Sequence, residues 1–344
     1  MKDSSPDKQL TYSVIIRTLS GGAKYQRLLD SIASQSIPPE HVYVVLPHGY
    51  PAPKEQMGTE EFLFTEKGMW NQRIFGLDYL WKNDIPSEFL IVCDDDIEFG
   101  PAFADRIMTL AKDNKADIVC PLEEVSCRPI SRMIYAMIGN RFESAKSRFK
   151  ISVTSGGGHI VNNALADNVN PTQSGIFQCF LIRNDAVTRL NLSEENWLDR
   201  TPYALFDDQV LFYKAYCYGM NVVSCKEPAF THLDAKSRVS KRVRARDTAY
   251  SMASNSMIFW HRFIYLNSSF PKPDTAKIAA ISRKLLMNFF FYTTRGLLRG
   301  DFKMMTSYIA GALSGMKFIR SSEYKAIPTV DRSSRTHKTR MNRP

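Results

Sequence analysis

Short apolar runs alternate with helical patterns along the first third of the chain. Residues 12–18 and 42–46 are apolar runs of strand length, and a third run at 87–93 stops at three carboxylates. Apolar residues recur at helical spacing over 25–34 and 68–81, between these runs. A continuous apolar run bounded by polar residues is typical of a strand buried on both faces. The order therefore predicts right-handed βαβ units around a largely parallel sheet.

The same alternation continues to about residue 233, with a less regular stretch in the middle. We predict a helix over 101–112, strands over 117–120 and 175–183, a helix over 207–218 and a strand over 221–224. The chain up to residue 233 is therefore predicted to be one α/β domain with a mixed, mainly parallel sheet.

After residue 233 the pattern becomes helical and basic. Residues 250–266 and 278–319 are rich in Met, Phe and Leu, and Lys or Arg interrupts the apolar runs. No window approaches the apolar length that crosses a bilayer. Two interpretations stay open: helices that lie in a membrane interface, or a helical cap packed on the α/β domain. We assign 234–328 to this helical region and 329–344 to a disordered basic tail.

Composition and charge narrow the setting of the protein. The 344 residues are 44% hydrophobic, which is ordinary for a globular protein with a sizeable core. The net charge of +10, most conspicuous at 236–246 and 332–343, implies an acidic partner such as nucleic acid, an anionic membrane or a phosphorylated substrate. The polar first nine residues predict no signal peptide. Six cysteines without close-paired spacing are predicted to be buried thiols in a reducing cytosol.

Asp94, Asp95 and Asp96 directly follow the apolar run at 87–93. Ligands of open α/β sheets bind beyond the carboxyl ends of the strands, so these acids lie where such a sheet does its chemistry. Three adjacent carboxylates repel one another, and a divalent cation, which prefers oxygen ligands, would remove the repulsion. The alternative is an acidic turn in which one Asp caps the next helix. We favour a metal and diphosphate site.

In order along the chain, several segments resemble the family 2 glycosyltransferases, which have the glycosyltransferase A fold. The matching segments are the strand at 13–16, the helix at 28–36 that ends in Gln-Ser, the helix with Gly68, Arg73 and Gly76, the D-x-D motif at 94–96, the strand with Gly175 and Arg183, the E-D-x-D-L motif at 206–211, and His232. The resemblance runs from residue 12 to about 232 and implies a single Rossmann-like glycosyltransferase A domain over 1–233.

The resemblance implies an inverting, metal-dependent transferase that moves a sugar from a nucleotide-diphosphate donor to a glycan or lipid-linked acceptor, in surface polysaccharide synthesis. Mg²⁺ or Mn²⁺ would stabilise the leaving diphosphate. By resemblance, the metal ligands would be Asp94, Asp96 and His232. Contacts to the donor would come from Thr18, Arg73, Asp94 and Asp95. For Arg73, a solvated charge on the helix surface is the alternative.

Asp208 is the candidate general base that accepts the proton of the acceptor hydroxyl. It lies at a predicted helix N-terminus, where the helix dipole favours a negative charge. Plain helix capping by Asp207 and Asp208 is the alternative. One base and no evident second nucleophile predict direct displacement with inversion at the sugar carbon.

Three further features allow two interpretations each. Residues 236–246 would form a lid over the diphosphate, or a loop exposed to water or anionic lipid. The glycines at 156–158 would approach a ligand closely or form a hairpin, with His159 incidental. Trp197 and Tyr203 would stack on an acceptor sugar or, as we favour, pack in the core.

The sequence departs from the family pattern at several positions. The second strand ends in Val-Leu-Pro-His-Gly at 45–49, without the Asp that reads the nucleotide base in the family. Ile74 stands where the family has Asn, Asp207 where it has Glu, and Val210 where it has the second Asp of E-D-x-D. The candidate general base is retained, but recognition of the donor's nucleotide base has no predicted residue.

Two other functions fit the sequence less well. A phosphatase with an Asp nucleophile commonly has D-x-D-x-[TV] near its first strand, whereas here the motif comes late and Glu98 fills the last place. A non-catalytic basic scaffold on membranes would use 236–246 and the tail, but it leaves the acids unexplained. Nucleic acid is not expected, because the basic residues lie in flexible segments. We expect a cytoplasmic protein, with peripheral contact to the cytosolic membrane face left open.

Overall fold

The computed structural model describes residues 10–122, 141–142, 147–233 and 241–330. The chain divides into two compact units. The first unit comprises Met1–Pro121, Ile176–Asn191 and Cys225–Ala235, and the second comprises Leu122–Gly175, Leu192–Ser224 and Lys236–Pro344. The domain boundary at residue 233 stays a prediction.

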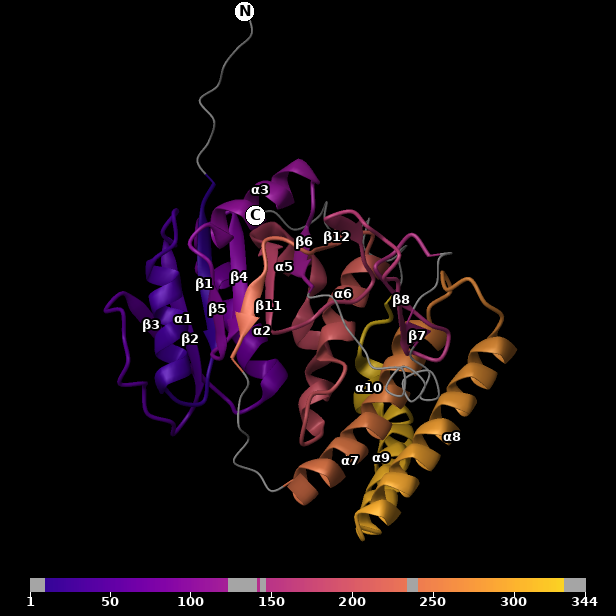
Figure 1. The fold of residues 1–344 in the computed structure, drawn as a ribbon. Coiled ribbons are helices and arrows are strands. Elements are labelled where there is room, and N and C mark those ends of the chain that lie inside the picture. Colours follow the sequence, from indigo (N-terminus) through magenta and orange to yellow (C-terminus); the bar gives the residue numbers. More distant parts are fainter. Residues whose placement is uncertain (1–9, 123–140, 143–146, 234–240, 331–344) are drawn as a thin grey trace, which may run out of the picture. The chain divides into compact units, whose positions relative to one another are not determined.

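The first unit contains the sheet that the apolar runs predict (Figure 1). Its strands follow the order β6-β11-β4-β1-β2-β3. Their bounds are Ile118–Pro121 for β6, Cys179–Arg183 for β11, Phe89–Asp94 for β4, Tyr12–Arg17 for β1, His41–Pro47 for β2 and Glu60–Thr65 for β3. β1 is parallel to β2 and β4, and β2 is parallel to β3, whereas β11 is antiparallel to both β4 and β6. The prediction of a mixed, mainly parallel sheet is confirmed.

Three helices of the first unit follow the sequence pattern, namely α1 at Ala23–Ala33, α2 at Met69–Lys82 and α3 at Phe103–Asp113. A short helix, α5 at Asn184–Leu190, was not predicted. Gly76 lets α2 pack closely on the sheet, because a Cβ atom at this position would lie 2.6 Å from Cγ2 of Ile15 on β1. This close approach explains the glycine on the inner face of α2 and fixes the helix that also carries Arg73.

A second, two-stranded sheet of the first unit was not predicted as a pair. β5, Ile97–Phe99, lies antiparallel to β13, Phe230–His232. β5 follows the three acids directly, and β13 ends at the candidate histidine. The ladder therefore joins two segments that are far apart in the sequence.

The second unit begins with short strands and helices. β7 at Arg141–Phe142, β8 at Ile151–Val153 and β9 at His159–Val161 form a three-stranded sheet, and β10 at Val169–Pro171 lies beside β12 at Val222–Cys225. A 3₁₀ helix, η1 at Leu192–Arg200, and the helix α6 at Asp207–Cys217 complete this part. β8 and β9 are antiparallel, so the glycines at 156–158 lie in a hairpin turn, one of their two expected roles.

The described residues from 241 onwards are mainly helical, as the sequence predicts. The helical elements are α7 at Lys241–Trp260, the π-helical turn η2 at His261–Tyr265, α8 at Asp274–Leu298, α9 at Lys303–Ile319 and α10 at Ser322–Ala326. The helical stretch predicted at 278–319 is two helices, which a turn at Gly300, with φ +61°, separates. α7 and α9 pack closely, because a Cβ atom on Gly315 would lie 2.7 Å from the carbonyl oxygen of Ser254.

The prediction of a basic loop at 236–246 is wrong for its second half. α7 begins at Lys241, so residues 241–246 are helical. Lys, Arg and Ala have high helix propensity, which favours a helix here. The helix was missed because this segment has no apolar periodicity. Arg246 also pairs with Asp301, at 2.7 Å between Nη2 and Oδ1. Residues 123–140, 143–146, 234–240 and the tail from 331 lie outside the described residues.

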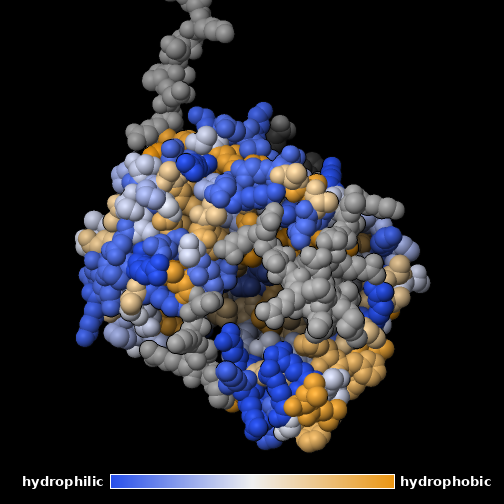
Figure 2. All heavy atoms as spheres, viewed as in Figure 1, coloured by the Kyte–Doolittle hydropathy of each residue, from blue (hydrophilic) through white to orange (hydrophobic). Residues whose placement is uncertain are grey.

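Helices α8 and α9 carry an unusual number of exposed apolar side chains. These are Ile278, Leu286, Phe290, Leu297, Leu298, Ile309 and Leu313, together with Phe302 in the turn between the helices. Figure 2 shows hydrophobic residues gathered over the lower part of α8, with hydrophilic residues beside them. Among the described residues, no helix is long and apolar enough to cross a membrane.

Candidate active site

Asp94 is the last residue of β4 and is held by two arginines. Its register partner on β1 is Arg17, whose Nε lies 3.1 Å from Oδ1 of Asp94. Nη2 of Arg73, from α2, lies 2.6 Å from the same oxygen. Burial alone would raise the pKa of Asp94, but the two guanidinium groups outweigh it and lower the pKa below its usual value. Asp94 is therefore an ionised carboxylate anchored at the end of the sheet.

The guanidinium of Arg73 has a second contact besides Asp94. This group lies over the ring of Phe177 at 4.2 Å, and the residue is only 2% exposed. In this structure the side chain is occupied with Asp94 and is no exposed helix charge. The geometry favours a role in positioning Asp94.

Asp95 accepts a hydrogen bond from the hydroxyl of Thr18, the residue that follows β1. Burial raises the pKa of Asp95 and outweighs this hydrogen bond, and the negative charges of Asp94 and Asp96 raise it further. Gln72 of α2 fixes the backbone here, because its Nε2 donates to the carbonyl oxygens of Thr18, at 3.0 Å, and Val45, at 3.1 Å. The mutual repulsion predicted for the three acids is therefore visible at Asp95.

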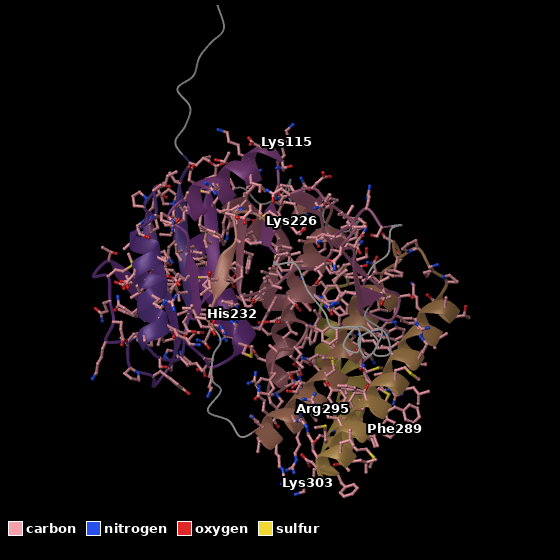
Figure 3. The ribbon with its side chains drawn as sticks, in the orientation of Figure 1. Lys115, Lys226, His232, Phe289, Arg295 and Lys303 are labelled. Atoms are coloured by element: carbon pink, nitrogen blue, oxygen red, sulfur yellow. The ribbon has the colours of Figure 1, made fainter. Side chains whose placement is uncertain are left out.

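Asp96 lies beside His232, with 3.5 Å between Oδ2 and Nε2. The pairing of β5 with β13 places them there, since His232 is opposite Ile97 and the amide of Leu233 donates to the carbonyl oxygen of Asp96 at 2.7 Å. Lys24 of α1 donates to the carbonyl oxygen of Leu233 and holds the same strand end. Figure 3 labels His232 at this end of β13. Asp96 and His232, two of the three residues predicted to bind the metal, are therefore close to each other.

The residues around Asp96 fit a divalent cation whose coordination a substrate would complete. Mg²⁺ usually binds through one or two carboxylates plus substrate phosphates, and a neutral imidazole is a common metal ligand. Asp96 and His232 supply an oxygen and a nitrogen. The structure does not bring Asp94 to this pair, and within the described ranges no three His, Cys, Asp or Glu side chains form a metal-binding group. Metal binding by Asp94 stays a prediction.

Asp208 belongs to the second unit and lies in the first turn of α6. Phe206, just before the helix, has φ 79° in the left-handed region, so the chain turns sharply into α6. Oδ1 of Asp208 accepts the amide of Gln209 at 2.7 Å, and Oδ1 of Asp207 accepts the amide of Asp208 at 3.0 Å. Both acids thus bind amides at the helix start, where the dipole favours their charge.

A buried ionic cluster behind α6 was not predicted from the sequence. Lys214, fully buried on α6, lies 2.6 Å from Oε1 of Glu195 and 3.0 Å from Oε2 of Glu194. Two nitrogens of Arg262 each lie 2.7 Å from Glu195. Burial would raise the pKa of Glu195, but the two cations outweigh it and lower the pKa to about 2. Glu195 was not singled out because its partners come from distant segments.

Other residues named from the sequence have structural roles. Trp197 is buried and donates from Nε1 to Glu195 at 2.7 Å, as the core interpretation expects. Burial and the charge of Lys284 lower the pKa of His159 to about 4. The five cysteines in the described part of the chain are buried, as predicted, and Cys127 lies outside it.

The mixed, mostly parallel sheet flanked by helices, with carboxylates at the end of β4, matches the glycosyltransferase A fold. Among solved structures, the chain is similar to S. aureus TarS, with a TM-score of 0.50 and 14% identity over 92% of this chain and 50% of TarS. The chain thus spans about half the length of that protein. The likeness concerns the fold.

Two other solved structures align at lower scores. One is TarS 1–349 in complex with UDP-GlcNAc, with a TM-score of 0.45 and 13% identity over 88% of this chain and 79% of that one. The other is the mannosyltransferase PcManGT from Pyrobaculum calidifontis in complex with GDP-Man and Mn²⁺, with a TM-score of 0.44 and 13% identity over 90% and 88%. No protein-family model and no curated protein matches the sequence.

Proposed function

We propose that the protein is an inverting, metal-dependent glycosyltransferase that uses a nucleotide-diphosphate sugar. The observation that carries this proposal is the pairing of Asp96 with His232 at the end of β4. A carboxylate and an imidazole at this edge of an α/β sheet suit a cation that binds a diphosphate. The glycosyltransferase A fold supports the same reaction class.

In this proposal Asp96 and His232 hold Mg²⁺ or Mn²⁺. When bound, the cation offsets the negative charge that develops on the leaving diphosphate. Thr18, Asp94 and Asp95 contact the nucleotide, and Arg73 keeps the Asp94 carboxylate ionised and in place. The buried ion pair between Arg73 and Asp94 supports this division of roles.

Asp208 acts as the general base in the proposed reaction. The acceptor hydroxyl loses its proton as its oxygen attacks the anomeric carbon, so one carboxylate has to accept that proton. A position in the first turn of α6 supports an ionised Asp208, because helix dipoles stabilise negative charge there. A single base without a protein nucleophile corresponds to direct displacement and inversion.

The acceptor in this proposal is a glycan or a lipid-linked acceptor in surface polysaccharide synthesis, at the cytosolic face of a membrane. Its support is the apolar surface of α8 and α9. Arg295 and Lys303 lie near the turn between these helices (Figure 3), and Arg299 directly follows α8. Apolar side chains bordered by cations are typical of segments that lie in an anionic membrane interface.

A thermal-shift screen tests the donor proposal. Purified protein is heated with nucleotides and nucleotide-diphosphate sugars, each with and without Mn²⁺, and the best ligand is then assayed for transfer. We expect at least one nucleotide sugar to raise the melting temperature only with the metal, because ligands stabilise the state they bind. Asp96→Asn should lose this shift, whereas Asp208→Asn should keep it and lose transfer. A metal-independent shift, or normal turnover by Asp208→Asn, would contradict the corresponding assignment.

A further inference from the structure

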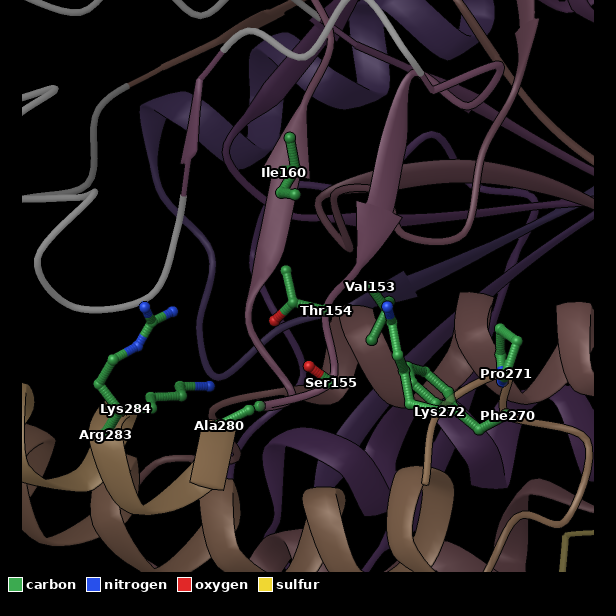
Figure 4. Close-up of a pocket in the computed structure, with 11 residues that line it drawn as sticks. Val153, Thr154, Ser155, Ile160, Phe270, Pro271, Lys272, Ala280, Arg283 and Lys284 are labelled. Carbon is green, nitrogen blue, oxygen red and sulfur yellow. The ribbon is translucent and has the colours of Figure 1, made fainter. Parts of the chain in front are cut away.

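A cavity in the second unit has a lining that none of the roles above explains (Figure 4). Its volume is about 540 Å³, within the range of small-molecule sites. The β8–β9 hairpin contributes Thr154, Ser155 and Gly156, and the segment around α8 contributes Lys272, Arg283 and Lys284, among others. All of these residues belong to the same compact unit.

The charge of the lining has one sign. In Figure 4, Arg283 and Lys284 lie on one side, Lys272 on the other, and the hydroxyls of Thr154 and Ser155 between them. No Asp or Glu is present among the described residues that line the cavity. Three cations and two hydroxyls without a carboxylate are complementary to an anion with several acceptor oxygens.

Lys284 is the most unusual member of this set. It is 5% exposed, and its Nζ donates to the carbonyl oxygen of Gly157 at 2.8 Å and lies 4.9 Å from the ring centroid of Phe206. A carbonyl and an aromatic ring only partly offset the burial of an ammonium group. Burial accordingly lowers the pKa of Lys284 to about 7. No carboxylate of the described residues pairs with Lys284, and an anion in the cavity would supply a countercharge.

The hairpin opposite α8 is built rigidly. Gly156 packs against the helix backbone, because a Cβ atom there would lie 3.0 Å from the carbonyl oxygen of Ala280. Trp260 donates from Nε1 to the carbonyl oxygen of Ser155 at 3.1 Å, and the amide of Gly158 donates to the hydroxyl oxygen of Thr154 at 3.0 Å. The glycines therefore serve packing, and the two hydroxyls have a fixed backbone.

Apolar groups complete the lining beside the cations. They are Val153, Ile160, Phe270, Pro271 and Ala280. A free inorganic ion would leave these groups uncovered, whereas a phosphate ester places an organic part against them. Arg283 offers the planar fork that matches phosphate oxygens, and the lysines offer point charges.

We propose that this cavity binds a phosphate ester, with Arg283, Lys284 and Lys272 holding the phosphate and the apolar residues contacting its organic part. The phosphate belongs either to a soluble sugar phosphate or to the headgroup of a lipid. The proposal does not rest on glycosyl transfer, since it concerns binding by residues of the second unit alone.

Calorimetry and vesicle sedimentation test the proposal on the full chain. The soluble probes are glucose 1-phosphate, glycerol 3-phosphate, inorganic phosphate and uncharged glucose, and the lipid probe is a phosphatidylcholine vesicle with phosphatidic acid. We expect saturable binding of a phosphate ester, no binding of glucose, and at least tenfold weaker binding by both Arg283→Gln and Lys284→Met. Arg106→Gln changes an exposed arginine on α3 that does not line the cavity and has no role in either proposal, and this variant should bind as the unmodified protein does.

The outcomes separate the two sources of the phosphate. Binding of a soluble ester assigns the site to small molecules, whereas binding of the vesicles alone assigns it to a lipid headgroup. In either case the Arg283→Gln variant must lose affinity for the ligand that binds. Arg283 is exposed, so its substitution leaves the fold intact, and urea denaturation verifies this for Lys284→Met. The proposal is overturned if no phosphate ester binds in either arm. It is equally overturned if Arg283→Gln binds normally or Arg106→Gln loses as much affinity.

Discussion

Nε2 of His232 lies 3.5 Å from Oδ2 of Asp96, although the two residues come from distant parts of the sequence. The contact depends on backbone pairing, because β13 is antiparallel to β5 and Leu233 donates its amide to Asp96. Backbone pairing therefore places an oxygen and a nitrogen donor together at the end of β4, as the proposed cation site requires.

Removal of either donor should weaken metal binding. Asp96→Asn and His232→Gln each delete one of the two proposed ligands, so we expect at least tenfold lower Mn²⁺ affinity in the presence of the donor nucleotide. Electron paramagnetic resonance of free Mn²⁺ measures this directly. His41→Gln, at an exposed position at the start of β2, is the matched control and should leave the affinity unchanged. Equal Mn²⁺ binding by all three variants would exclude this site.

Loss of Arg73 should cost stability. Arg73→Met leaves the buried Asp94 carboxylate with Arg17 alone, and breaking a buried pair typically costs about 3 kcal/mol. Urea denaturation measures the free energy of unfolding. Arg27→Met is the comparison, because Arg27 pairs with Glu98 at the surface and exposed pairs contribute about 1 kcal/mol or less. Similar losses in the two variants would show that Arg73 does not anchor Asp94.

The sequence predicted the centre of the first unit well, for identifiable reasons. β4 is buried along its whole length, so its residues form an unbroken apolar run, and the acids end it abruptly. β3 was missed because Glu60–Thr65 alternates exposed and buried side chains at the edge of the sheet. Edge strands of this kind lack the continuous apolar signal of central ones.

The partners of the site residues were harder to predict. Arg17, Arg73 and Asp94 meet because β1, α2 and β4 pack together, and no local pattern states which arginine reaches which acid. The same holds for Glu195, whose charge is offset by Lys214 and Arg262 from two other segments. Tertiary pairing of charges leaves no periodic trace in a single sequence.

The cluster around Glu195 should make stability depend on pH. The pKa of Glu195 is lowered from 4.5 to about 2 in the folded protein, so the folded state binds its proton less tightly than the unfolded state. The stabilisation is therefore complete above about pH 4.5 and is lost as the pH falls towards 2. A shift of this size corresponds to about 3 kcal/mol.

Urea denaturation between pH 7 and pH 3 tests this dependence. We expect Glu195→Gln to be much less stable than the unmodified protein at pH 7, with a difference that shrinks towards pH 3. Glu323→Gln, which removes an exposed partner of Arg200, should show a small difference at every pH. A Glu195→Gln deficit that stays constant with pH would mean that packing, and not charge, accounts for it.

The turn between α8 and α9 should insert into anionic membranes if the protein acts at a membrane surface. Leu298 is 84% exposed and Phe302 is 67% exposed, and Arg299 and Lys303 border them. Phe302→Glu replaces an apolar contact by a charge that anionic lipid repels, so we expect about tenfold weaker binding to vesicles that contain phosphatidylglycerol. Sedimentation with the vesicles measures this binding, and added salt should weaken the binding of the unmodified protein. Trp81→Glu, at a 47% exposed position on α2, is the control. Unchanged binding by Phe302→Glu, or an equal loss in the control, would favour the interpretation of these helices as a packed cap.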